Sequence, residues 1–255
     1  MAPGRGKSYL KYQEQDSEGR TLGLKANKNV NPMKKSPIDR PQSLAAIVAE
    51  RLKDSILRRE LALGEALSEE KIAAAMEVSR TPVREALTIL QLQGLITIIP
   101  RRGSFVFKPD GGDLHALVEY RLQLELLASG LALERARVAT HRDLMKAIRL
   151  MQKARDADDT MAYANADSLF HNAFFDHCGN HFFVEAFDIV SGRIAALRSH
   201  LSAPLGLHRK RTFQEHVEIA KAFEENDPAV LREVLTTHIA AMEPNYANAL
   251  ALLAR

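Results

Sequence analysis

The sequence has no tryptophan and one cysteine, and only 6% of its 255 residues are aromatic. A single cysteine, Cys178, cannot form an intramolecular disulfide, which is typical of a protein that folds in a reducing compartment. No apolar run reaches the roughly 20 residues that a membrane-spanning helix requires, and the N-terminus lacks the apolar core of a signal peptide. We therefore expect a cytoplasmic protein with no membrane partner.

The sequence also has little excess charge, with a formal net charge of +3. Any binding to nucleic acid would therefore depend on where the cations lie and not on their total number. The apolar content of 46% consists largely of alanine and leucine, which indicates a mostly helical globular protein. A chain of this length suits two domains of ordinary size.

The N-terminal segment, residues 1–41, is rich in glycine, proline, lysine and asparagine and has no sustained apolar period. Its lysines and arginines outnumber its acidic residues, so we expect a disordered basic arm. The arm is either a passive tail or a source of phosphate contacts. The sequence leaves both possibilities open.

The most informative stretch is residues 78–95, VSRTPVREALTILQLQGL. At helical spacing its apolar residues fall on one face and its polar residues on the other. Pro82 lies in the first turn, where its missing N–H is not needed. Arg80, Thr81 and Arg84 then project from the helix N-terminus, as in a recognition helix that contacts bases and phosphates. The alternative is an ordinary surface helix with two solvated arginines.

The flanking segments favour the recognition helix. Residues 44–56 have an apolar stripe at helical spacing, and Ser68 followed by two glutamates begins a second helix. Residues 95–99 and 104–107 are β-rich and are joined by a turn with two arginines. We therefore predict a winged helix-turn-helix over residues 42–108. Its expected DNA-binding residues are Ser79, Arg80, Thr81, Arg84, Arg102 and Gly103.

The rest of the chain has no strand pattern. Residues 109–112, Pro-Asp-Gly-Gly, are expected to be a linker, and residues 113–255 an all-helical bundle. The overall fold class is therefore mostly α. Six helices are expected, at residues 113–138, 141–157, 160–177, 181–201, 206–225 and 228–252.

The bundle contains a possible set of metal ligands. Asp167 and His171 are four residues apart, so both can reach one ion from the same helical face. His216 and His238 occur in later expected helices. Imidazole and carboxylate together suit a divalent transition metal such as zinc, nickel or manganese. From these residues alone, a hydrogen-bonded pair and unrelated surface or core histidines are favoured over a four-ligand site.

Residues 67–106, LSEEKIAAAMEVSRTPVREALTILQLQGLITIIPRRGSFV, resemble the DNA-binding domain of the GntR family of bacterial transcription regulators. Leu63-Gly64 departs from the Pro-Gly that the family usually has in a turn. The segments DSLFHN at 167–172, CGN at 178–180 and EHVEI at 215–219 resemble the FCD ligand-binding domain of the FadR subgroup.

The resemblance implies particular roles for residues of the bundle. It implies a metal held by Asp167, His171, His216 and His238, and a small carboxylate effector that completes the coordination of the metal. Arg121 resembles an R-x-x-x-E feature of the family and could bind the carboxylate, and Arg198 and Asn172 are further candidate ligand-binding residues. Arg121 could instead simply pair with Glu125 one turn away.

These observations predict a repressor that binds a palindromic operator in double-stranded DNA as a homodimer, because one recognition helix reads only a few base pairs. It would control a catabolic operon in the bacterial cytoplasm and associate with the nucleoid when bound to DNA. Two alternatives use the same residues. One is a metal-dependent enzyme acting on small organic acids, and the other is a sensor whose ligand is the metal itself.

Overall fold

The computed structural model describes residues 42–201 and 206–253. The expected basic arm, 1–41, lies outside the described residues. Within the described ranges, no helix combines the length and the apolar character needed to cross a bilayer.

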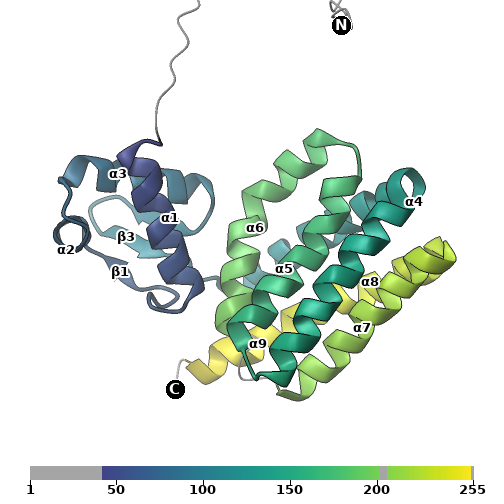
Figure 1. Ribbon diagram of the computed structural model, residues 1–255. Helices are drawn as coiled ribbons and strands as arrows, with labels where there is room; N and C mark the ends of the chain where they lie inside the picture. Colours follow the sequence, from purple (N-terminus) through teal and green to yellow (C-terminus); the bar gives the residue numbers. More distant parts are fainter. Residues whose placement is uncertain (1–41, 202–205, 254–255) are drawn as a thin grey trace, which may run out of the picture. The chain divides into compact units, whose positions relative to one another are not determined.

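The N-terminal part of the described chain is a winged helix-turn-helix (Figure 1). Its three strands form an antiparallel sheet in the order β1-β3-β2. In chain order its elements are α1 (Leu44–Leu57), β1 (Ala66–Leu67), α2 (Glu69–Ala75), α3 (Arg80–Leu92), β2 (Ile96–Ile99) and β3 (Gly103–Val106).

Local sequence explains where these helices begin and end. Ser43 and Ser68 each accept a backbone N–H bond at the start of α1 and α2. Gly94 ends α3 with a φ of 71°, which favours glycine. The expected apolar face of α3 is confirmed, since its four residues are at most 1% exposed: Val83, Ala86, Leu87 and Leu90. Strand β1 was not expected, and it exists because Ala66 pairs with Phe105 of β3.

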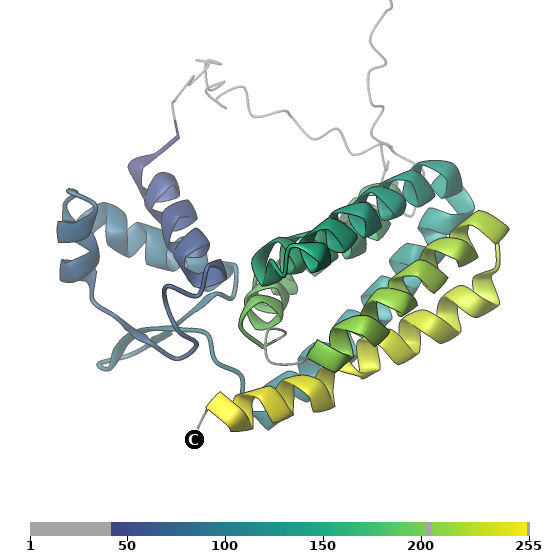
Figure 2. The same ribbon diagram turned by 60° about the horizontal axis from the view of Figure 1, so that its bottom comes forward.

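The C-terminal part is all-helical, which confirms the expected fold class (Figures 1 and 2). Its helices are α4 (Gly111–Asp156), α5 (Thr160–His177), α6 (His181–Leu201), α7 (Gly206–Glu225), α8 (Pro228–Ala240) and α9 (Met242–Leu253).

Two details of this part differ from the sequence-based expectation, and one agrees with it closely. Residues 109–112 are not a free linker, because Asp110 caps α4 in a reciprocal capping box with Asp113. The two helices expected at 113–138 and 141–157 are present as the two halves of α4, which meet at the non-helical residue Ala136 (φ −145°, ψ 35°), a few residues before the expected break. Figure 2 shows the change of direction between the two halves of α4. The last expected helix is divided in two at Ala241.

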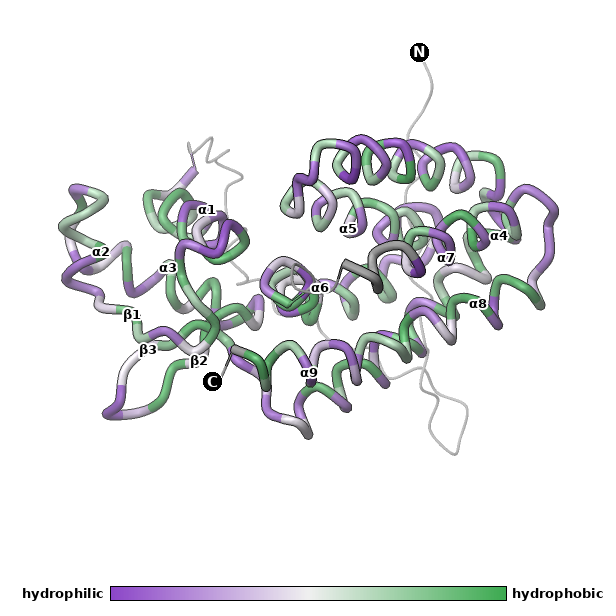
Figure 3. The backbone as a smooth tube through the Cα atoms, turned by 90° about the horizontal axis from the view of Figure 1, so that it is seen from below, coloured by the Kyte–Doolittle hydropathy of each residue, from purple (hydrophilic) through white to green (hydrophobic). Residues whose placement is uncertain are grey.

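Apolar and polar segments alternate along each helix of this part (Figure 3). The buried side of the helices forms one hydrophobic core that includes Phe170, Phe174 and Phe223. Ionisable side chains are also buried among the helices, where an unpaired charge would be costly. The described residues of this group are Arg121, Glu125, Asp167, His171, Arg198, His216 and His238.

Candidate functional site

Three buried histidines from three helices come together in the helical part. His171 lies on α5, His216 on α7 and His238 on α8. One ring nitrogen of each lies within 4.8 Å of the others. Each imidazole carries polar ring nitrogens, and buried polar atoms need partners. A ligand shared by the three rings would be one such partner.

Asp167 joins this cluster from α5. Its Oδ1 lies 3.1 Å from His216 Nε2, and its Oδ2 lies 3.9 Å from His171 Nε2. The structure thus brings together all four residues expected to bind a metal. Burial would raise the pKa of the Asp167 carboxyl, but Arg198 together with the neighbouring His216 and His171 outweighs burial and holds the pKa well below its usual value. Asp167 is therefore an anion at neutral pH.

A buried ion pair on α4 orients His171. Arg121 Nε donates to Glu125 Oε1 at 2.5 Å, and Glu125 Oε2 lies 2.6 Å from His171 Nδ1. Burial would raise the pKa of Glu125, yet Arg121 and His171 together lower it to about 2. An ionised carboxylate can only accept hydrogen bonds, so Nδ1 of His171 must carry the proton. His171 then presents an unprotonated Nε2 to the cluster, and burial lowers its pKa to about 3.

A second ion pair, on α7, orients His238. Arg211 Nε donates to Glu215 Oε1 at 2.7 Å, and Glu215 Oε2 lies 2.9 Å from His238 Nδ1. Burial would raise the pKa of Glu215, but its bonds to His238 and Arg211 lower the pKa. Nδ1 of His238 is therefore the donor, and Nε2 of His238 also faces the cluster.

The resulting arrangement fits a divalent metal. Nε2 of His171 and Nε2 of His238 are 3.2 Å apart, so two lone pairs face each other unless a proton or a cation lies between them. Nδ1 of His216 has no hydrogen-bond partner among the described residues, and its Nε2 lies 3.1 Å from Asp167 Oδ1. Burial lowers the pKa of His216, which keeps the ring neutral and able to coordinate. Three imidazoles with one carboxylate suit zinc or nickel.

The three residues expected to bind an effector differ in their positions. Arg121 is buried, and its Nη2 has no partner among the described residues although Nε bonds Glu125. Arg198 is buried against Asp167 and also donates to Ser168 Oγ at 2.7 Å. Asn172 is exposed and is not brought to the cluster, because it follows His171 by one residue and faces another direction on α5.

Sequence reasoning missed Glu125 and Glu215 as parts of the site. Glu125 was considered only as a partner of Arg121, and Glu215 only as a neighbour of His216. The available signal was an Arg-x-x-x-Glu spacing that occurs once on α4 and once on α7. Each pair contacts a histidine on another helix, so the spacing alone could not identify the role of the glutamate.

The winged helix-turn-helix provides a second candidate surface. Ser79, Arg80, Thr81 and Arg84 are all exposed at the N-terminus of α3. Ser79 occupies the capping position, but its side chain makes no capping bond. Arg84 Nε and Arg80 Nη2 share one carboxylate oxygen of α2, Glu69 Oε2, at 2.7 Å and 3.3 Å.

The wing lies at the turn between β2 and β3. Arg101 and Arg102 are exposed there, and Arg101 has a φ of 63°. Gly103 has a φ of 110° and is exposed, with open space where a side chain would begin. The expected DNA-binding residues Arg102 and Gly103 therefore lie on an accessible turn.

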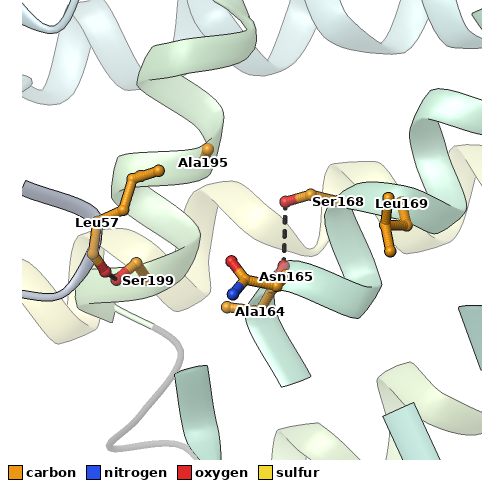
Figure 4. A pocket seen from close by; sticks show the side chains of 7 residues that line it. All are labelled: Leu57, Ala164, Asn165, Ser168, Leu169, Ala195 and Ser199. Carbon is orange, nitrogen blue, oxygen red and sulfur yellow. Dashed lines mark hydrogen bonds between the residues drawn. The ribbon is translucent and has the colours of Figure 1, made fainter. Parts of the chain in front are cut away.

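The end of α1 contacts α6 close to the histidine cluster. The hydroxyl of Ser199 donates to the Leu57 carbonyl, and His200 Nε2 lies 2.8 Å from the Ile56 carbonyl. A cavity of about 290 Å³ adjoins these contacts (Figure 4). It is lined by Leu57, Ala164, Asn165, Ser168, Leu169, Ala195 and Ser199.

A winged helix-turn-helix with exposed arginines, followed by a helical domain with a buried polar cluster, defines a class of DNA-binding regulators. Residues 44–106 match the family described as bacterial regulatory proteins, gntR family, and residues 116–241 match the FCD domain. The chain belongs to the GntR family and is a DNA-binding transcription regulator. The matched families are regulators and not enzymes, so the enzyme alternative has no support.

Relatives with curated descriptions agree with this assignment. The chain is 33% identical over 201 residues to an uncharacterised HTH-type transcriptional regulator of Streptomyces ambofaciens, covering 75% of this chain and 80% of that protein. It is 28% identical to the HTH-type transcriptional repressor NanR of Cronobacter sakazakii, with 88% of each chain covered.

Solved structures show the same fold. A putative GntR transcriptional regulator from Rhodococcus sp. RHA1 superimposes with a TM-score of 0.72 at 24% identity, over 81% of this chain and 99% of that chain. Escherichia coli McbR/YncC gives a TM-score of 0.66 at 23% identity, over 81% and 100% of the two chains.

Proposed function

We propose that this regulator is a repressor whose DNA binding responds to a small carboxylate bound beside a divalent metal in its FCD domain. The observation that carries the proposal is the buried cluster of Asp167, His171, His216 and His238. The four side chains meet from three helices, and the Nε2 atoms of His171 and His238 face each other at 3.2 Å. When bound, the metal would supply a positive charge that attracts an anionic ligand.

The charges around the cluster favour an anionic effector. Three arginines pair with three carboxylates in and around the site: Arg121 with Glu125, Arg198 with Asp167 and Arg211 with Glu215. These pairs balance one another, so a divalent ion adds two uncompensated positive charges to a largely buried region. A carboxylate would neutralise them, which lowers the cost of burying the ion.

Arg121 supplies a specific contact for such an effector. Its Nε is occupied by Glu125 and its Nη1 lies 3.1 Å from the Met242 sulfur, whereas Nη2 is buried without a partner among the described residues. A buried unsatisfied donor is costly, and a carboxylate oxygen satisfies it with a charge-assisted hydrogen bond. We therefore retain Arg121 as an effector-binding residue.

DNA recognition would use Ser79, Arg80, Thr81 and Arg84 of α3 with Arg102 and Gly103 of the wing. A single recognition helix contacts only a few base pairs, so a homodimer on a palindromic operator would supply the missing specificity. The relatives named NanR are described as repressors, which supports repression here. Control of a catabolic operon would follow from an organic-acid effector. Membership of the FadR subgroup stays a prediction.

Residues of α6 connect the two candidate sites. Arg198 holds Asp167, while Ser199 and His200, the next two residues, contact the last turn of α1. A change in the coordination of Asp167 would therefore move the turn of α6 that contacts the DNA-binding domain. Such a connection provides the differential contact that allosteric coupling requires.

The test combines three measurements on the full chain. We expect elemental analysis to find one stoichiometric divalent metal, and calorimetry to detect a small carboxylate that binds only the metal-loaded protein. The same carboxylate should change the affinity for an operator selected from random DNA, whereas its uncharged amide should not. A protein without stoichiometric metal after growth with zinc or nickel would contradict the proposal. DNA affinity that responds to metal but to no acid would favour the metal-sensor alternative.

A further inference from the structure

The two ion pairs next to the histidine cluster have the same geometry, although nothing in the sequence makes them an internal repeat. We call Arg121 with Glu125 the α4 pair, and Arg211 with Glu215 the α7 pair. In each pair the arginine precedes the glutamate by four residues on one helix, and arginine Nε donates to glutamate Oε1. In each pair, glutamate Oε2 then contacts Nδ1 of a histidine on a neighbouring helix.

This repetition has a chemical consequence for the two histidines. A neutral imidazole carries its proton on either Nδ1 or Nε2, and only the unprotonated nitrogen can bind a metal. Each glutamate is paired with an arginine through Oε1 and lies within hydrogen-bond distance of Nδ1 through Oε2, so this geometry favours the proton on Nδ1 in His171 and His238. The nitrogens that remain free to coordinate are the two Nε2 atoms, and these are the atoms that face each other at 3.2 Å.

His216 provides an internal contrast. Its side chain is fully buried, but its Nδ1 has no hydrogen-bond partner among the described residues. Its carboxylate contact is instead on Nε2, which lies 3.1 Å from Asp167 Oδ1. The cluster thus consists of two histidines with an outer carboxylate on Nδ1 and one without.

We propose that Glu125 and Glu215, each held by its arginine, are positioning residues that fix the tautomer of His171 and His238 for metal binding through Nε2. This inference rests on the proposed metal centre and extends it to four residues that do not touch the metal. The arginines act through the glutamates, because each occupies the carboxylate oxygen that does not contact the histidine. Loss of such an outer carboxylate typically weakens metal binding 10- to 100-fold.

The two pairs differ in burial, which makes the proposal testable even if one variant does not fold. The Glu125 side chain is fully buried, so Glu125→Gln endangers the fold. The side chains of Glu215 and Arg211 are 12% and 60% exposed, so Glu215→Gln and Arg211→Gln can be accommodated at the surface. Glu218→Gln is the matched control, because Glu218 is exposed on α7 one turn away and is not among the contacts of the cluster.

The experiment measures zinc affinity by competition with a chromophoric chelator, using the full chain. We expect Glu215→Gln to bind zinc about 10- to 100-fold more weakly than wild type, and Arg211→Gln to show a smaller loss, since Glu215 keeps its bond to His238. Glu218→Gln should match wild type. Glu125→Gln, where it folds, should resemble Glu215→Gln.

Nitrogen-15 NMR of the zinc-loaded protein separates positioning from a general structural effect. In wild type, His171 and His238 should each show a ring proton on Nδ1, shifted downfield by its bond to a carboxylate. Glu215→Gln should change the His238 signal and leave that of His171 in place. Ring protons on Nε2 in the wild type would overturn the assignment.

The outcomes also separate this inference from the proposed function. If wild type binds zinc and Glu215→Gln binds it as tightly as Glu218→Gln does, the positioning role is wrong and the metal centre stands. If wild type binds no zinc or other divalent metal, the metal centre is wrong, and both pairs are only ion pairs between helices.

Discussion

At the scale of single residues, the helical domain is notable for ionisable groups whose pKa values are lowered by different causes. Burial lowers the pKa of His171 and His216, because a charged imidazole loses its hydration. Neighbouring cations lower the pKa of Glu125 and Asp167 despite burial. All four shifts make the folded state less stable in acid than at neutral pH, because the unfolded chain binds protons that the folded protein does not.

The first prediction concerns acid stability of chelator-treated protein. Between pH about 6.5 and about 3, unfolded chains bind a proton at His171 that the folded protein does not bind. The free energy of unfolding should therefore fall as pH falls, by about 1.4 kcal/mol per pH unit for each such histidine. Urea unfolding between pH 7 and pH 4.5 measures this slope.

A comparison variant identifies the groups responsible. His216→Gln removes one titrating imidazole, so its slope should be shallower than that of wild type. Below pH about 4.5, Glu125 and Asp167 also lower the free energy of unfolding, because they take up protons at a higher pH in the unfolded chain than in the folded protein. An unfolding free energy that stays constant from pH 7 to pH 4.5 would contradict the lowered histidine pKa values.

The second prediction concerns Arg198, which is the ion-pair partner of Asp167. Arg198→Met leaves a buried carboxylate without its cation, and breaking a buried pair typically costs about 3–5 kcal/mol. A divalent ion would replace the missing charge, so added zinc should raise the melting temperature of this variant more than that of wild type. Arg149→Met, at an exposed position on α4, should behave like wild type. Equal zinc-induced shifts in all three proteins would show that Asp167 does not contact the metal.

At the scale of elements, α2 and α3 form a prearranged surface. Glu69 on α2 accepts bonds from Arg84 Nε and Arg80 Nη2 on α3. The hydrogen bond from Arg84 lowers the pKa of Glu69, so the carboxylate remains ionised beside the arginines. Because the pair uses Nε of Arg84, the outer guanidinium nitrogens remain available for a guanine or a phosphate.

The third prediction tests this surface with an operator selected from random DNA. Arg84→Ala should weaken operator binding by about 1–3 kcal/mol while changing non-specific binding less. Glu69→Gln should lower the ratio of specific to non-specific affinity, because it releases Arg84 and removes a negative charge near the phosphates. Fluorescence anisotropy with operator and scrambled duplexes measures both ratios. If neither substitution changes the ratio, α3 does not read bases through Arg84.

The same elements show what could be predicted from sequence and what could not. The buried face of α3 followed from apolar spacing, and the wing followed from two β-rich runs around a turn. The break within α4 was expected near residue 139, but its exact position at Ala136 could not be predicted, because neither glycine nor proline marks it. The partnership of Glu125 with His171 was also not predictable, since it joins residues 46 positions apart on different helices. Tertiary packing determined both.

At the scale of the whole molecule, the proposed regulation needs a physical link between the proposed metal centre and the DNA-binding domain. One turn of α6 provides contacts to both, since Arg198 holds Asp167 and Ser199 donates to the carbonyl of Leu57 in α1. His200 contacts the preceding carbonyl of α1, that of Ile56. These carbonyls belong to the last turn of α1, where acceptors lack the usual i+4 partner, although the Ile56 carbonyl also accepts the Arg59 N–H.

The last prediction is that Ser199→Ala weakens this link without affecting either site. Zinc affinity in the absence of DNA should equal that of wild type, because Ser199 does not contact the histidine cluster. In wild type, zinc should change operator affinity by a factor that corresponds to a coupling free energy of about 1–3 kcal/mol. Linkage requires DNA to change zinc affinity by the same factor, so two independent titrations measure one quantity.

In Ser199→Ala, the factor by which zinc changes operator affinity and the factor by which DNA changes zinc affinity should both move toward one. Ser191→Ala is the matched control on α6, because the Ser191 hydroxyl bonds a carbonyl of its own helix, that of Asp188, and should keep the wild-type coupling. Coupling in Ser199→Ala that equals the coupling in wild type and in Ser191→Ala would mean that the contact with α1 does not transmit the change. Any transmission would then run through other contacts of α6, such as the close approach of Gly192 to the Gln93 carbonyl that follows α3.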